Sequence, residues 1–183
     1  MSATSIRNIE SVLAFHAAPT LMGVKCGSLL SLSAKGCDVG RLEESLDSKR
    51  LGVRFVNRGD TRRLVYIFDK ALLDKTLAAA DVKAFLARYG YDPSWGAQSC
   101  LDRLCERLVQ SDFPHEVGIF LGYPLEDVKG FIANCGQRCK LCGVWKVYSD
   151  VDKARAMFEC FENCRICLCR QIESGRPLRA CVA

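Results

Sequence analysis

The sequence lacks long apolar runs, a leader-like start and a strong excess of charge of either sign. No apolar run approaches the ~20 residues that a helix needs to cross a bilayer, so no membrane partner is expected. Met1 to Pro19 lacks the charged start and continuous apolar stretch of a signal peptide, which predicts a cytoplasmic protein. The 26 basic and 21 acidic residues are well mixed, and their net charge of +5 makes a nucleic-acid partner unlikely on physical grounds.

Proline and histidine are also scarce, at five and two residues. Together with 49% apolar and 26% charged residues, few prolines indicate a globular chain and argue against disorder. A length of 183 residues fits one ordinary domain, and no repeat or linker divides it, so residues 1–183 are expected to form a single domain.

Cysteine, in contrast, is abundant. Seven of the 12 cysteines fall between Cys135 and Cys169, and residues 135–173 form a cysteine-rich stretch. In a reducing compartment such cysteines indicate metal ligands, redox thiols or small core residues rather than disulfides.

Local patterns predict helices mixed irregularly with a few strands. Helices are expected at Ile6–Phe15 (interrupted after it by Pro19), Arg41–Lys49, Lys70–Leu77, Asp81–Tyr89, Ser94–Gln110, from Pro124 onward, and from Asp150 to about Glu173. Strands are expected at Ser28–Leu32, Val117–Leu121 and Val144–Tyr148, with a hairpin around Val53–Phe55 and Leu64–Phe68 that turns at Asn57, Gly59 and Asp60. The fold class is therefore α+β: a small mixed or antiparallel sheet with a hairpin, several helices and a long C-terminal helix.

The cysteine-rich stretch contains two groups of thiols. Cys135, Cys139 and Cys142 have the spacing C-x3-C-x2-C, which suits zinc or an iron–sulfur cluster. Cys160, Cys164 and Cys167 recur at i, i+4 and i+7, so they share one helix face and can supply further ligands. The alternative is that these cysteines pack as small hydrophobes, as a stripe at helical spacing usually does.

A second constellation involves the two histidines. His115 and the adjacent Glu116 are candidates for acid–base catalysis beside the turn Gly122–Pro124. His16 and Lys25, from an earlier polar segment, are candidates for holding a ligand or cofactor at the same place. The alternative is that each histidine only hydrogen-bonds the backbone where an element ends. Glu126 and Asp127 are interpreted as first-turn acids that favour the positive end of a helix dipole.

Four segments carry a resemblance to a known family. FPHEVGIFLGYPLEDVKGFI (Phe113–Ile132) is the most specific; HAAPTLMGVKCGSLL (His16–Leu30), CGVWKVYSD (Cys142–Asp150) and the stretch Cys164–Gly175 support it. Together they resemble a bacterial family of unknown function, found mainly in anaerobes. The resemblance implies no reaction or cofactor, but it singles out His16, Lys25, His115, Glu116, Cys142, Cys164 and Cys169.

Three functional hypotheses follow from these patterns. The first is a thiol-based metal-binding or redox-linked protein that uses Cys139, Cys142 and Cys164, with Cys160 or Cys167, and meets a redox partner protein. The second is an enzyme or binding protein for a small molecule, with a pocket around His115 and Glu116. The third is a regulatory or scaffold protein without chemistry of its own.

Overall fold

A three-stranded antiparallel sheet lies at the centre of the molecule. The computed structural model describes residues 3–33, 39–46, 48–59, 61–110 and 113–182. β1 (Gly27–Ser33) and β2 (Leu51–Arg58) both pair with β3 (Arg62–Asp69), which is the middle strand. β2 and β3 form the predicted hairpin, with Gly59 at a φ of 69° near its tip; Asp60 of the predicted turn lies outside the described residues. The α+β prediction, with an antiparallel sheet and a long C-terminal helix, is confirmed.

The middle strand is buried on both of its faces. Successive side chains of a strand point to opposite sides of a sheet. Leu64, Tyr66 and Phe68 accordingly enter one hydrophobic core, whereas Val65 and Ile67 enter another. The two cores therefore share β3, and they form the two halves of one domain.

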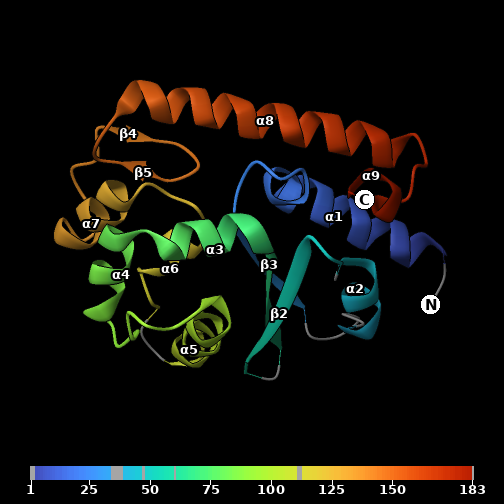
Figure 1. The fold of residues 1–183 in the computed structure, drawn as a ribbon. Helices are drawn as coiled ribbons and strands as arrows, with labels where there is room; N and C mark the ends of the chain where they lie inside the picture. Colours follow the sequence, from blue (N-terminus) through green and yellow to red (C-terminus); the bar gives the residue numbers. More distant parts are fainter. Residues whose placement is uncertain (1–2, 34–38, 47, 60, 111–112, 183) are drawn as a thin grey trace.

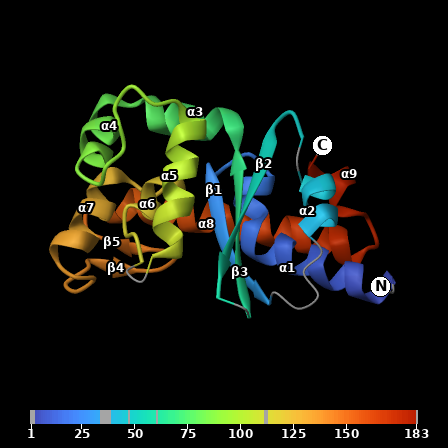
Figure 2. The same cartoon turned by 90° about the horizontal axis from the view of Figure 1, so that it is seen from below.

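Two groups of helices cover the two faces of the sheet (Figure 2). One group is α1 (Ala3–Leu21), α2 (Val39–Leu46), α8 (Val151–Glu173) and α9 (Leu178–Val182). The other is α3 (Lys70–Ala78), α4 (Ala80–Ala87), α5 (Ala97–Val109), α6 (Val117–Phe120) and α7 (Leu125–Ala133). None of the helices in the described ranges is long and apolar enough to cross a bilayer.

The long helix α8 extends beyond the sheet. Figure 1 shows it along the top of the molecule, above α1 at its C-terminal half and above a second, small hairpin at its N-terminal end. That hairpin consists of β4 (Leu141–Cys142) and β5 (Lys146–Val147). Trp145 and Val147 of the hairpin pack against Ala154 and Phe161 of α8 in a third, smaller core.

Three predicted elements differ from the observed ones. The predicted strand Val117–Leu121 is wrong: its residues form the short helix α6, and because they are buried on every side, no periodicity could separate helix from strand. The strand predicted over Val144–Tyr148 is reduced to the two residues of β5. The first helix does not end before Pro19 but runs through it to Leu21, because its inner face is packed in the core.

Candidate functional site

Residues 113–124 form a tight turn–helix–turn that presents Tyr123. Gly122, after α6, has a φ of 73°, a left-handed conformation that favours glycine. The N–H of Tyr123 donates to the carbonyl of Gly118 at 2.9 Å, which closes the turn. Pro124, predicted to be the first helical residue, is instead the N-cap of α7, one position before Leu125. The side chain of Tyr123 is thereby fixed between α6 and α7.

Asp127 ties the β4–β5 hairpin to α7. One carboxylate oxygen, Oδ2, accepts a hydrogen bond from the indole N–H of Trp145 at 2.7 Å. The other, Oδ1, accepts from the backbone N–H groups of Tyr148 and Ser149, both at 2.8 Å, and from the Ser149 hydroxyl at 2.7 Å. Burial raises the pKa of Asp127, but these donors outweigh it, so that the pKa lies below its ordinary value. The carboxylate is thus an ionised anchor.

Glu126 and Asp127 both lie in the first turn of α7, as predicted, but their surroundings differ. Glu126 is exposed and pairs with Lys129 at 2.8 Å on the helix surface, as a first-turn acid does. Asp127 is buried, and its partners lie 18 to 22 residues later in the chain. Its function is to position the hairpin, which the dipole argument does not predict.

Between residues 113–123, α7 and the hairpin lies a cavity of about 350 Å³, named here the tryptophan cavity. Most of its lining is apolar or aromatic: Phe113, Val117, Leu121, Tyr123, Val128, Phe131, Val144 and Trp145. His115, Cys142 and Lys146 add polar groups, while the carboxylate of Asp127 is already occupied. The cavity thus combines aromatic surfaces with a few groups able to form hydrogen bonds.

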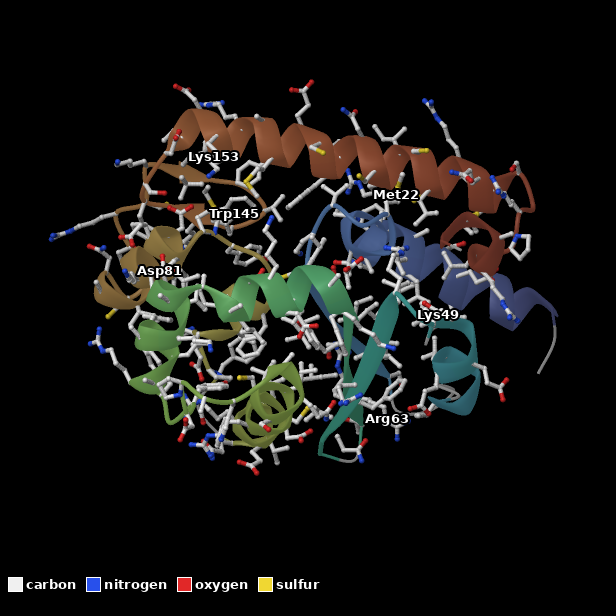
Figure 3. The ribbon with its side chains drawn as sticks, viewed as in Figure 1. Met22, Lys49, Arg63, Asp81, Trp145 and Lys153 are labelled. Carbon is white, nitrogen blue, oxygen red and sulfur yellow. The ribbon has the colours of Figure 1, made fainter. Side chains whose placement is uncertain are left out.

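The aromatic rings of the tryptophan cavity are held in fixed orientations. Trp145 stacks on Tyr123 with 4.9 Å between ring centroids, and the edge of Phe158 meets it at 4.5 Å. His115 lies 5.0 Å from the ring of Phe131. Figure 3 shows Trp145 beneath the N-terminal part of α8, the part that carries Lys153. The indole is therefore clamped between three elements before any ligand arrives.

His115 and Glu116 do not act together at this cavity. The side chain of His115 is exposed and lines the cavity. Glu116, only 1% exposed, forms an ion pair with the Nε of Arg107 and accepts a hydrogen bond from Tyr91 at 3.5 Å. Its carboxylate raises the pKa of Arg107, chiefly through their hydrogen bond. The predicted acid–base pair is thus separated: Glu116 joins α5 to α6, and His115 alone faces the cavity.

Lys25 and His16, predicted to approach the same site, lie elsewhere. The N–H of Lys25 donates to the carbonyl of Pro19 at 3.0 Å, which fixes the loop that leaves α1. The ammonium group lies 5.3 Å from the ring centroid of Tyr123, a wall of the tryptophan cavity, without lining that cavity itself. His16 is exposed on α1 and contacts the ring of its neighbour Phe15.

The structure does not bring the two groups of cysteines into one site. Cys164 is buried in the core between α1 and α8, whereas Cys160 and Cys167 are exposed. Cys139 and Cys142 lie before and within the β4–β5 hairpin, at the N-terminal end of α8. Within the ranges that the structure describes, no group of three or more His, Cys, Asp or Glu side chains is placed to hold a metal ion.

Sequence reasoning missed a contact that joins the N-terminal segment to α6. The S–H of Cys26, in the loop after α1, donates to the carbonyl of Phe120 at 3.3 Å. The hydroxyl of Tyr66 donates to the same carbonyl at 2.7 Å. Gly27 must be glycine here, because a Cβ would overlap that carbonyl oxygen. The contact joins two of the segments that carry the family resemblance, His16–Leu30 and Phe113–Ile132. Their shared membership in that resemblance was the one sequence signal that could have suggested that they meet.

One comparison with known proteins gives a match. A family model described as a protein of unknown function (DUF3793) matches residues 13–182, nearly the whole chain. This agrees with the resemblance to a family of unknown function. No curated protein and no solved structure matches.

Proposed function

We propose that this chain, which belongs to the family described as a protein of unknown function (DUF3793), binds a small, planar and mostly apolar molecule in the tryptophan cavity. The observation that carries the proposal is the cavity itself. Its volume of about 350 Å³ falls within the range of small-molecule pockets, and such pockets combine apolar walls with a few placed polar groups.

The walls indicate the shape of the ligand. Trp145, Tyr123 and Phe131 offer aromatic surfaces, and rings prefer to meet in stacked or edge-to-face arrangements. Because Asp127 holds the indole of Trp145 in place, little ordering remains to be done on binding, which favours affinity. A compact ring system is therefore the class of ligand that fits best.

The polar group of the ligand is expected to face His115. Its imidazole is exposed at the cavity and can donate or accept a hydrogen bond. Lys146 is less available, since its ammonium group already donates to the carbonyl of Gly136 at 2.6 Å. His115 is thus the residue expected to orient the polar group of the ligand.

A neutral fluorescent probe tests the proposal. N-phenyl-1-naphthylamine should bind the wild-type protein at one site with increased emission. Val144→Asp, which adds a charge to the half-exposed cavity wall, should weaken binding by at least about tenfold because the apolar ligand would cover the carboxylate and remove part of its water. Val109→Asp is the matched control, since Val109 is 61% exposed and does not line the cavity. Equal binding by both variants would contradict the proposal.

A second candidate function is a narrower form of the thiol hypothesis, limited to Cys139 and Cys142. The pKa of Tyr148 is raised, first by burial of its hydroxyl and to a lesser extent by the nearby thiols of Cys139 and Cys142. Cys142 is also exposed and lines the tryptophan cavity. Two cysteines in C-x2-C spacing suit zinc or a dithiol that a redox partner protein oxidises.

Metal content decides between these two forms of the second candidate. Elemental mass spectrometry of protein purified without oxygen should show zinc or iron near one atom per chain if the thiols are ligands, and Cys139→Ser should then abolish it. Cys181→Ser is a control outside the pair. If no metal is present and differential alkylation finds both thiols reduced under an oxidising glutathione buffer, the thiol role is rejected.

A further inference from the structure

A second cavity, of about 290 Å³, lies between the loop after α1, the helix α3 and the middle of α8. It is named here the lysine cavity, because Lys25 and Lys75 both line it. Its other walls include Leu72, Met157 and Phe161. The lysine cavity is distinct from the tryptophan cavity. The two are neighbours, because the ring of Tyr123, which lines the tryptophan cavity, also faces the Lys25 ammonium group.

The Lys25 ammonium group is placed against rings rather than against an acid. It lies 5.3 Å from the ring centroid of Tyr123 and 5.8 Å from that of Phe161. Contacts of a cation with aromatic faces contribute only about 0.5–2 kcal/mol. They compensate part of the cost of removing a charge from water, and burial accordingly lowers the pKa of Lys25 to about 8.

Within the described chain, Lys25 has no acidic counter-ion. No Asp or Glu is found in the lining of the lysine cavity, and the one group whose charge favours the ammonium form is the thiol of Cys26. Burial raises the pKa of that thiol to about 11, so it is neutral at pH 7. Asp69, the last residue of β3, already forms an ion pair with Arg50 and accepts a hydrogen bond from the backbone N–H of Leu72 in α3. The cavity is therefore built around an uncompensated positive charge.

We propose that the lysine cavity binds a small organic carboxylate, with Lys25 as its counter-ion and Lys75 as a second cation. A carboxylate supplies the counter-ion that a half-buried cation against aromatic rings lacks. Leu72, Met157 and Phe161 give the cavity apolar walls, which an inorganic anion would leave uncovered. The ligand class is thus a carboxylate that carries a short apolar body. This site goes beyond the proposed function, because it is formed by other side chains.

A titration of the full-length, isotope-labelled protein followed by NMR tests the proposal. The probes are hexanoate, its neutral analogue hexanamide, and inorganic phosphate. Hexanoate should shift the amide signals of Lys25, Gly122 and Phe161, and should bind about tenfold more tightly than hexanamide. Phosphate should bind more weakly than hexanoate, because it gains nothing from the apolar walls.

Three variants identify the residue responsible. Lys25→Met keeps the side-chain volume but removes the charge, and should weaken hexanoate binding by about tenfold or more. Lys25→Arg keeps the charge and should retain most of the affinity. Lys153→Met removes an exposed lysine of α8 outside the cavity and should change nothing.

Each contrary result has a definite meaning. Equal binding of hexanoate and hexanamide, or unchanged binding in Lys25→Met, overturns the proposal. Equal binding of phosphate and hexanoate overturns the claim that the ligand carries an apolar body. N-phenyl-1-naphthylamine binding should persist in Lys25→Met, so that failure at the lysine cavity remains distinguishable from failure at the tryptophan cavity.

Discussion

Replacing Asp127 by Asn should destabilise the fold strongly, although it exchanges only one carboxylate oxygen for an NH2 group. The asparagine carbonyl can take over the three donors at Oδ1, from Tyr148 and Ser149. Its NH2 group must then face the indole N–H of Trp145, so that two donors meet and no acceptor remains. Asp127→Asn therefore loses the charge-assisted bond and leaves a buried N–H unsatisfied.

The magnitude follows from these two losses. A hydrogen bond to a charged group contributes about 1.5–3 kcal/mol, and an unsatisfied buried donor costs about 1–3 kcal/mol. The free energy of unfolding should therefore fall by about 2.5–6 kcal/mol, out of a typical total of about 5–15 kcal/mol. Glu126→Gln, one residue earlier in the same helical turn, is the matched control. It should cost less than about 1 kcal/mol, because Glu126 makes only a surface ion pair.

Urea unfolding followed by tryptophan emission measures this difference. A Trp95→Phe background leaves Trp145 as the reporter, since the chain has two tryptophans. The pH dependence gives a second check. The pKa of Asp127 is lowered in the folded state, so its stabilisation is complete above the ordinary unfolded value of about 3.9 and is lost as pH falls through the folded value. The gap between wild type and Asp127→Asn should shrink below about pH 4.

Two results would refute this reasoning. If Asp127→Asn were as stable as Glu126→Gln at pH 7, the carboxylate would not be the anchor of the hairpin. If the two proteins differed at pH 7 by an amount that stayed constant down to pH 2.5, the loss would come from altered packing and not from the ionised carboxylate.

Three further substitutions test other parts of the structure. Gly27→Ala should lower the free energy of unfolding by at least about 2 kcal/mol in urea titrations, because the new Cβ overlaps the carbonyl oxygen of Phe120. Lys25→Met should raise the free energy of unfolding at pH 7 by up to about 3 kcal/mol, because the folded protein disfavours the charged form of the lysine. This gain should vanish as pH rises from about 8, the pKa of Lys25 in the folded protein, past about 10.5, its pKa in the unfolded chain. Glu116→Gln should lower the free energy of unfolding by about 3–5 kcal/mol, because it leaves the Arg107 guanidinium without its charged partner. The variant should still bind N-phenyl-1-naphthylamine. If a folded variant lost that binding, Glu116 would have a role in the tryptophan cavity after all.

The elements that sequence analysis predicted well are those with local signals. Asp150 was expected to begin the last helix, and its carboxylate accepts a hydrogen bond from the N–H of Lys153 at 3.0 Å. The helix ends at Glu173, close to the predicted end, and Gly175 just after it has a φ of 91°. The short helix α6 was missed because it is buried on all sides and has no polar face to reveal its period.

The site was harder to predict, because its contacts join segments far apart in the chain. His115 was identified and does line a cavity, but Glu116 was assigned to the same task only because it is adjacent in sequence. The role of Asp127 depends on donors 18 or more residues away, which no local pattern reveals. Cys164 shares a helix stripe with exposed cysteines, yet the packing of α1 against α8 buries it, and spacing within one helix cannot show which neighbour covers it.

The extent of α8 bears on how a molecule can reach the lysine cavity, which the helix helps to line. The helix has 23 residues and is about 34 Å long at 1.5 Å per residue. Its first half roofs the lysine cavity with Met157 and Phe161, whereas its second half is locked into the core through Leu168 and Ile172. Lifting the roof would therefore mean withdrawing the far half from that core as well. We therefore expect a ligand to enter the lysine cavity without displacement of α8, which acts as a rigid wall of that cavity.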